Sequence, residues 1–413
     1  FMVLENGGDT RAVLELPQQY ALESLEPTIS ACVVEVDAAR VACDLHIVGV
    51  DKAAGDDVDR TERRIDWLRK TGEDWRILRS VAVDPETSEQ LVAGGAVQDK
   101  EFGVSLAVPE GWEAQVVGGN CARQFAVVGS APAAMLTLFI QEVPEAPEPA
   151  KIGDSFPKVM PQLGGSAKLL GEAAVQVAGR PAHRAEYELQ LRSLTVQHAQ
   201  VAYVRKEDVG ATLYVLALTA TRAESFSEAK PAFEQLLAGA ALTERQPTAF
   251  PPEYGIIADG RYYNAERQVR MDIPDGWAAR LMRNGGKPFM LVLSRPGSEN
   301  HVVLIMVDIG VWVDPKEALQ SSIKGGELGG GKLTTIDEGP IEKGEVSGYQ
   351  ATLQGNRDGD KTCTLWQAFL MRSTTLFVLG GFTSPQESYD DLKADWQAML
   401  DSLKLGAEAL EGE

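Results

Sequence analysis

The feature that most constrains this fold is an internal repeat between residues 102 and 405. The segments 104–114 (VSLAVPEGWEA) and 269–279 (VRMDIPDGWAA) carry one pattern at a spacing of 165 residues. Alternating apolar positions predict a strand, and the Pro-acid-Gly-Trp turn that follows predicts where the strand ends. Self-similarity over such a span predicts two divergent copies of one domain.

The repeat continues along both segments. Residues 134–143 and 300–309 are both predicted strands, and Asp314 followed by Pro315 predicts the start of a helix. Each copy then predicts two more strands and a closing helix with apolar residues every three or four positions. The matched residues are 201–204 with 367–370, 213–216 with 376–379, and Phe226, Phe233, Leu236 and Leu242 with Tyr389, Trp396, Met399 and Leu405.

This order of elements predicts an α+β domain in which helices pack on an antiparallel sheet. The alternative is that two unrelated domains share these marks by chance. A chain of 413 residues exceeds the ~250–300 residues at which one core stops growing, so several domains are expected. The predicted parts are a β-rich N-terminal domain (1–97), a first copy (98–245), a proline-rich linker (246–261), a second copy (262–405) and an acidic tail (406–413).

The strand with its turn, the β-meander and the closing aromatic helix resemble the superfamily of the PsbP extrinsic protein of photosystem II, the Ran-binding Mog-type proteins and the bacterial DcrB-like lipoproteins. The resemblance implies two αβα sandwiches with antiparallel sheets, used mainly for docking, and no shared catalytic constellation. It is carried by structural residues alone: Pro109, Gly111, Trp112, Pro274, Gly276 and Trp277.

The N-terminal 97 residues are weakly similar to nuclear-transport-factor and SnoaL-like domains. The similarity rests on two predicted hairpins, one over residues 31–50 and one over residues 63–83 with its turn at 71–74. The long helices that open those domains are not found in the sequence, so the resemblance implies a truncated or rearranged version of that fold.

Charge and hydrophobicity exclude some partners. The chain has 60 acidic and 39 basic residues, a net charge of -21, which disfavours nucleic acid and anionic lipid. Its longest apolar stretches fall well short of the ~20 residues that cross a bilayer, so membrane association is expected only through a partner or a lost lipid anchor. Phe1 is not an initiator residue, and processing would place the protein in the periplasm or outside the cell, with the cytoplasm left open.

The search for catalytic chemistry yields little, and no cofactor or metal is predicted. Residues 326–332 (GELGGGK) match the spacing of a phosphate-binding loop, but Leu333 replaces its Ser or Thr and a strand is predicted next. The four histidines form no zinc pattern, and the acidic segments 51–59 and 356–360 are predicted as turns or solvated loops. Asp44 and His46 lie on one side of a predicted strand. If that side lined a SnoaL-like pocket, the pair could act as a general base, and the alternative is therefore an enzyme that uses this pocket.

Two cysteines present a choice that the sequence leaves open. A two-residue turn at Asp37 and Ala38 would place Cys32 opposite Cys43, close enough for a cross-strand disulfide. Two free thiols are the alternative. A disulfide would support an extracytoplasmic location.

A difference between the copies predicts a contact surface. After the matched strand the first copy reads Val-Pro-Glu-Ala-Pro (143–147), whereas the second carries Val311, Trp312 and Val313. We expect the apolar triplet to be covered by another domain or chain, because tryptophan is common among interface anchors; a loop that buries Trp312 locally is the alternative. The chain is therefore predicted to be a non-catalytic protein-binding or structural subunit, with a carrier of a small apolar ligand or lipid as the other alternative.

Overall fold

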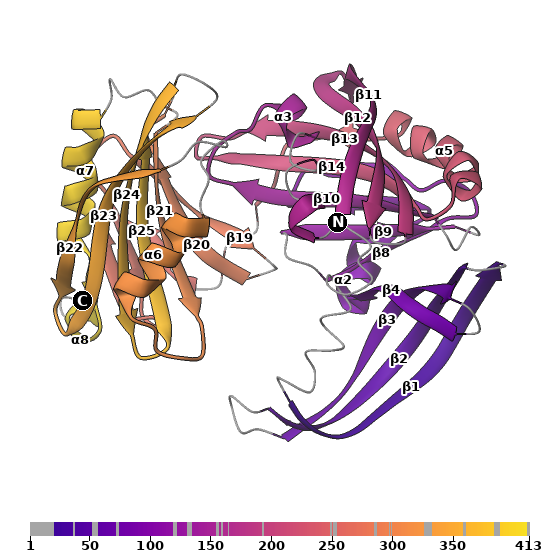
Figure 1. The fold of residues 1–413 in the computed structure, drawn as a ribbon, viewed down its shortest axis with the longest axis horizontal. Coiled ribbons are helices and arrows are strands. Elements are labelled where there is room, and N and C mark those ends of the chain that lie inside the picture. The colour runs from indigo at the N-terminus through magenta and orange to yellow at the C-terminus, as the bar shows by residue number, and fades with distance from the viewer. Residues whose placement is uncertain are drawn as a thin grey trace. The chain divides into compact units, whose positions relative to one another are not determined.

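The computed structural model describes residues 20–410 and divides them into two compact units (Figure 1). The first unit comprises Phe1–Gln141, Pro147–Val204 and Leu213–Thr248, and the second comprises Glu142–Ala146, Arg205–Thr212 and Ala249–Glu413. Within 20–410 the description leaves out residues 36–37, 52–56, 72–73, 119–121, 130–133, 154–156, 158–159, 164, 192–193, 248–249, 251–253, 285–286, 297, 299, 326–332, 358–360 and 384–388.

The first unit begins with a four-stranded antiparallel meander that contains both predicted N-terminal hairpins. Its strands are β1 (Tyr20–Glu35), β2 (Ala38–Asp51), β3 (Asp57–Thr71) and β4 (Asp74–Ala82), in that order across the sheet. Along β2, Cys43, Leu45 and Ile47 are buried while the residues between them are partly exposed. One face of this sheet is therefore covered, as the alternation along a strand requires.

The register of β1 and β2 decides between the two alternatives for Cys32 and Cys43. Glu35 pairs with Ala38, which places Cys32 opposite Val41 instead of Cys43. Cys32 is exposed, Cys43 is buried, and both are free thiols. The predicted pairing of Cys32 with Cys43 was wrong because it placed the turn one residue too late, and such a shift changes every cross-strand pair. The alternative of two free thiols holds.

Two further antiparallel sheets complete the first unit, in the orders β15-β7-β6-β5 and β11-β12-β13-β14-β10-β9-β8. The small sheet contains β5 (Val92–Ala93), β6 (Ala96–Asp99), β7 (Val104–Ala107) and β15 (Ala241–Leu242). The large sheet contains β8 (Glu113–Val116), β9 (Arg123–Val128), β10 (Ala134–Val143), β11 (Gly165–Val177), β12 (Arg180–Leu191), β13 (Leu194–Lys206) and β14 (Ala211–Ala220). The helices are α2 (Pro85–Leu91), α3 (Pro149–Gly153), the 3-10 helix η1 (Met160–Leu163) and α5 (Ala223–Ala238).

The second unit has a small sheet ordered β16-β17-β18-β26 and a large one ordered β19-β20-β21-β25-β24-β23-β22. The small sheet contains β16 (Ile256–Ala258), β17 (Arg261–Asn264), β18 (Val269–Asp272) and β26 (Lys404–Leu405). The large sheet contains β19 (Ala278–Asn284), β20 (Lys287–Ser294), β21 (His301–Asp308), β22 (Thr334–Lys343), β23 (Val346–Arg357), β24 (Lys361–Arg372) and β25 (Thr375–Thr383). The helices are α6 (Pro315–Gly325), α7 (Tyr389–Ser402) and α8 (Ala407–Leu410).

If β8 to β14 are matched in chain order with β19 to β25, the two large sheets have the same strand order. The two small sheets also agree, with β5, β6, β7 and β15 matched to β16, β17, β18 and β26. Turns correspond as well: the Asp99 carboxylate accepts the backbone N–H of Phe102 at 3.1 Å, and the Asn264 side chain accepts that of Arg267 at 2.7 Å. These features agree with the predicted repeat. That the two halves superpose as one domain stays a prediction.

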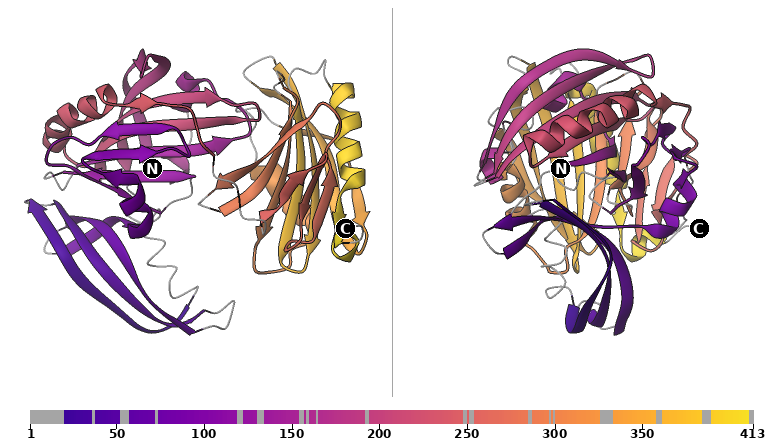
Figure 2. Two further views of the ribbon diagram at one scale, coloured as in Figure 1. Left: turned by 180° about the vertical axis from the view of Figure 1, so that it is seen from behind. Right: turned by 90° about the vertical axis from the view of Figure 1, so that its right-hand side faces the viewer.

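Helices α6 and α7 cover opposite faces of the large sheet in the second unit. Both are labelled in Figure 1, and α7, in yellow, is seen again beside the sheet in the left view of Figure 2. Leu319 of α6 packs against Leu353 and Phe369, while Trp396 and Met399 of α7 belong to the core on the other face. This arrangement is a helix–sheet–helix layering. It follows from the apolar residues at helical spacing on α7 and at alternate positions along the strands.

In the first unit, α5 covers one face of the large sheet through residues such as Phe233. The opposite face is shared. Ile152 of α3 packs near Phe139 on part of it, and Trp67 of the N-terminal meander packs with Val128 on another part. The segment predicted as a separate N-terminal domain thus lies within the first compact unit.

One predicted alignment is wrong by a single residue. On β13 the residues that face the α5 core are Ala199, Val201 and Tyr203, whereas on β24 the residues that face the α7 core are Trp366, Ala368 and Leu370. The prediction matched Val201 with Gln367. Because successive side chains on a strand point to opposite faces, the correct match for Val201 is Ala368, and Ala199 corresponds to Trp366.

No helix in the described part of the chain is long and apolar enough to cross a membrane. The predicted acidic tail starts inside the fold, since residues 407–410 form α8 and Ala409 is buried. Hydrogen bonds from Gly406 N to Gln268 O and from Ala409 N to Gly406 O, at 2.9 and 3.0 Å, fix this start.

Candidate partner-binding loop

The loop from Ile309 to Val313 joins β21 to α6 and presents apolar side chains to solvent. Val311 is 60% exposed and Trp312 is 62% exposed. Val307, at the end of β21, is 37% exposed. The alternative that this loop buries Trp312 locally is therefore wrong. Whether a partner covers these side chains stays a prediction.

Two aspartates hold the ends of the loop. The Asp308 carboxylate accepts the backbone N–H of Gly310 at 3.0 Å, and this hydrogen bond, followed by one from Thr374, lowers the pKa of Asp308. At the other end, Asp314 Oδ1 accepts the backbone N–H groups of Lys316 and Glu317 at 2.9 and 3.2 Å. This is the predicted N-cap of α6. The exposed residues thus lie on a loop whose two ends are fixed by hydrogen bonds.

Both Pro-acid-Gly-Trp turns have the same backbone conformation. Gly111 and Gly276 have φ of 77° and 79°. The backbone N–H of each tryptophan donates to the proline carbonyl of its turn, at 3.0 Å for Trp112 and 3.1 Å for Trp277. Positive φ favours glycine at this position. The turns are therefore structural in both units, as the resemblance implied.

The indole rings that follow these turns differ in burial. Trp277 is buried and donates from Nε1 to Asp395 Oδ2 of α7 at 2.7 Å, with the Arg295 guanidinium 5.6 Å from its ring. Trp112 is half-buried and packs against Gly129, where an added Cβ would lie 2.5 Å from the ring. The turn is therefore common to both units, whereas the burial of the indole ring that follows it is not.

Asp44 and His46 lie on the partly exposed face of β2 and bind different partners. Asp44 accepts from Arg63 Nε at 3.0 Å, and His46 Nε2 lies 2.7 Å from Asp59 Oδ1. The His46 and Asp59 side chains are 42% and 76% exposed. Each residue is thus paired with a different side chain of β3, at the solvent-facing side of the sheet.

Other candidates from the sequence lie partly or wholly outside the described residues. The segment 326–332 with the phosphate-loop spacing is outside them, as are Cys121, most of 51–59 and residues 358–360; the strand predicted after Lys332 is present as β22. Where side chains are described, no group of three or more His, Cys, Asp or Glu residues could hold a metal ion.

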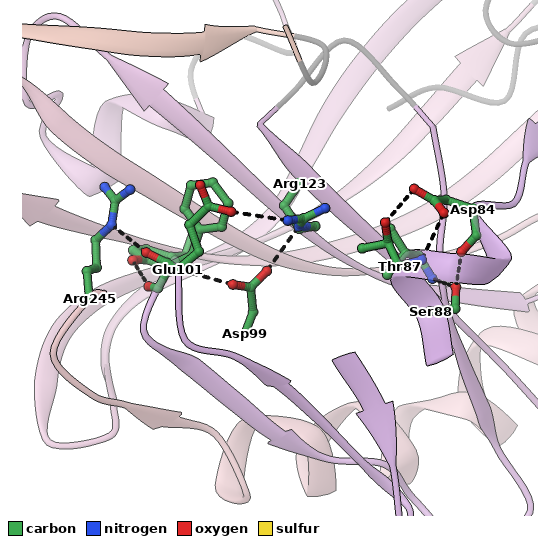
Figure 3. A network of polar contacts seen from close by, with 10 residues as sticks. Asp84, Thr87, Ser88, Asp99, Glu101, Arg123 and Arg245 are labelled. Carbon is green, nitrogen blue, oxygen red and sulfur yellow. Dashed lines mark hydrogen bonds and ion pairs between the residues drawn. The ribbon is translucent and has the colours of Figure 1, made fainter. Parts of the chain in front are cut away.

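A partly buried charged cluster of the first unit is structural. Arg123 donates from Nε to Asp99 at 3.0 Å and from Nη2 to Glu101 at 3.3 Å, and Arg245 donates to the Glu101 carbonyl at 3.0 Å (Figure 3). Nearby, Asp84 caps α2 by accepting the N–H of Thr87 at 2.9 Å. These groups are hydrogen-bonded to one another. The cluster therefore attaches the turn that joins β6 and β7 to strand β9.

One apolar cavity bears on the carrier alternative. It lies between α5 and the large sheet of the first unit, is lined by residues such as Leu138, Tyr214 and Leu237, and has a volume of about 30 Å³. That is room for two or three water molecules, at about 10–15 Å³ each. A lipid would not fit without repacking this core.

No protein-family model matches the sequence, and no curated protein matches it. Several solved structures are similar at low identity. Cyanobacterial PsbP from Synechocystis is 16% identical, with 36% of this chain and 91% of that chain covered and a TM-score of 0.29. The Ran-binding protein Mog1p of Saccharomyces cerevisiae is 11% identical, with 36% and 96% covered and a TM-score of 0.27. The immunity protein TplEi of Pseudomonas aeruginosa is 12% identical, with 71% and 97% covered and a TM-score of 0.22.

Proposed function

We propose that this chain is a non-catalytic protein-binding subunit and that the loop with Val311, Trp312 and Val313 contacts its partner. The observation that carries the proposal is a tryptophan, Trp312, that is 62% exposed on a loop with both ends hydrogen-bonded. Burying the exposed part of such a ring contributes about 3 kcal/mol, from about 200 Å² per aromatic side chain at about 25 cal/mol per Å².

The fixed ends of the loop favour binding in a second way. A loop that is already ordered loses little conformational entropy when a partner covers it. Asp308, Asp314 and Glu317 surround the apolar residues with negative charge, while Lys316 adds one positive charge. The partner surface that fits is an apolar pocket with a basic rim.

The proposed architecture is a repeat of one αβα docking domain. Support comes from the common strand order of the large sheets, the common order of the small sheets, and the matching turns at Gly111 and Gly276. We place the protein in the periplasm or outside the cell, in an assembly that a partner or a lipid anchor would attach to a membrane. The free thiols of Cys32 and Cys43 give that location no support from a disulfide.

The test compares Trp312→Ser with Ile256→Ser, a matched control because Ile256 is 48% exposed on β16 of the same unit. Affinity capture from the native source, followed by mass spectrometry, should recover one partner with the wild-type chain and the control. Recovery with Trp312→Ser should fall at least about tenfold, as loss of about 3 kcal/mol predicts, with an unchanged melting temperature. Equal recovery with all three chains, or a large fall in melting temperature for Trp312→Ser, would contradict the proposal.

A further inference from the structure

The second unit contains a groove between α7 and the outer strands β22 and β23, with a volume of about 210 Å³. We name it the α7 groove. Asp337 of β22, Gln350 and Thr352 of β23, and Lys393, Trp396 and Gln397 of α7 line it. The volume is smaller than the ~300–1,000 Å³ of sites for drug-sized ligands. The groove therefore suits a small metabolite.

The register explains why the groove lies there. Asp337 pairs with Thr352, Thr352 with Trp366, and Trp366 with Gly381, so the four residues form one row across β22, β23, β24 and β25. Paired residues on neighbouring antiparallel strands share a face. Helix α7 covers the inner end of this row, where a Cβ added at Gly381 would lie 2.7 Å from the Trp396 ring. The outer end, on β22 and β23, forms the floor of the groove.

The corresponding place in the first unit is closed by charged side chains. Arg184 of β12 lies between Glu234 of α5, at 2.7 Å, and Glu186, at 2.8 Å, and Lys230 of α5 lies 3.2 Å from Glu186. The Arg184 guanidinium also lies 5.6 Å from the Phe233 ring. These contacts tie α5 to the sheet across the space that is open in the second unit.

In the second unit most of this charge is missing. Gln350 pairs with Gly339 and Ala368, as Arg184 pairs with Ala173 and Val201, so Gln350 takes the place of Arg184. By the same alignment Thr352 takes the place of Glu186, and Gln397 that of Glu234, while Lys393 keeps the charge of Lys230. Gln397 donates instead to Asp401 of its own helix, at 3.0 Å. The bridge that closes the first unit is therefore not formed from these residues.

Two polar atoms at the groove are left without partners in the described part of the chain. They are Gln350 Oε1, an acceptor, and Trp396 Nε1, a donor, and both are shielded from solvent. Trp396 as a whole is only 4% exposed. An unpaired buried polar group destabilises a protein by about 1–3 kcal/mol, and a ligand that supplies the missing partners would remove this cost.

The groups around the groove define the ligand that would fit. The Asp337 carboxylate and Gln350 Oε1 both accept hydrogen bonds and suit an ammonium group. The Lys393 ammonium and the Trp396 N–H both donate and suit a carboxylate. Trp366 and the 54%-exposed Ile336 of β22 add apolar surface. We propose that the α7 groove binds a free α-amino acid with an apolar side chain.

Calorimetric titration of the full chain with L-leucine tests the proposal. Two analogues that keep the isobutyl side chain of leucine probe one charge each: isocaproate lacks the ammonium group and isoamylamine lacks the carboxylate. L-Leucine should bind with millimolar or tighter affinity. Each analogue should bind at least about tenfold more weakly, the loss expected for one charge-assisted hydrogen bond. Absence of leucine binding, or equal binding of an analogue, would overturn the proposal.

The first unit supplies a matched control variant. The double substitution Gln350→Arg and Gln397→Glu recreates the Arg184–Glu234 bridge and should close the α7 groove, abolish leucine binding and keep the melting temperature. Trp396→Phe removes only the indole N–H and its second ring, and should weaken leucine binding about tenfold or more. Leucine binding that survives the double substitution in a folded chain would place the amino acid elsewhere and overturn the assignment.

Discussion

Single residues in this protein show how burial decides the chemistry of a side chain. His46 is exposed beside Asp59, whereas His198 is 3% exposed and lies on β13 between Thr219 and Gln200, at 2.9 and 3.4 Å. Burial lowers the pKa of His198 from 6.5 to about 3. The sequence offers His198 on a strand, and only the elements that cover it keep its imidazole uncharged well below neutral pH.

The first prediction concerns pH and His198. Between pH 6.5 and pH 3 the unfolded chain binds a proton at this residue and the folded protein does not, so this contribution to stability is complete above pH 6.5 and is lost as the pH falls. The slope is at most about 1.4 kcal/mol per pH unit. In urea titrations at a series of pH values, His198→Gln should reduce the slope of the first unit's free energy of unfolding against pH by that amount. An unchanged slope would show that His198 does not titrate in this way.

At the scale of elements, the two Pro-acid-Gly-Trp turns set where β7 and β18 end and β8 and β19 begin. Their glycines have positive φ, and nothing lies within 4 Å of a Cβ built on either one. Steric crowding therefore plays no part, and the requirement for glycine comes from the backbone alone.

This geometry predicts the effect of Gly276→Ala. The substitution should lower the free energy of unfolding of the second unit by about 1–2 kcal/mol, the cost of the left-handed region for a residue with a Cβ. Gly339→Ala is the control, because Gly339 also has open space around it but lies in strand β22 without positive φ. Urea unfolding should show the loss for Gly276→Ala only. Equal stabilities of the two variants would mean that the turn relaxes.

At the scale of the whole molecule, two compact units with separate cores predict two unfolding transitions. Trp277 belongs to the core of the second unit and Trp112 packs against the core of the first. Each tryptophan follows the same turn, so the pair reports on the two cores through equivalent positions of the chain.

Trp277→Ala should lower the stability of the second unit by about 3–5 kcal/mol, the usual cost of truncating a buried tryptophan. The transition of the first unit should stay where it is. Trp112→Ala should shift the other transition, and by less, because Trp112 is only half-buried. Differential scanning calorimetry measures both. If either substitution moved both transitions equally, the two units would unfold as one.

The sequence alone determined the order of the elements, because alternation, helical spacing, prolines and glycines act locally. It placed the strands 104–107 and 134–143, the N-cap at Asp314 and both glycine turns where the structure has them. It failed where one residue of register matters, at Cys32 and at Val201, because the two faces of a strand differ only by a step of one.

Only the tertiary structure decided which side chains are covered and which meet. The sequence could flag Trp312 as out of place beside its polar counterpart, but exposure depends on what packs over the loop. The α7 groove was beyond sequence reasoning, because Asp337, Gln350 and Trp396 lie on three elements and meet only when α7 packs on the sheet. The only trace in the sequence is that Gln350 and Gln397 of the second unit stand where the first unit has Arg184 and Glu234, and this match needed the strand register.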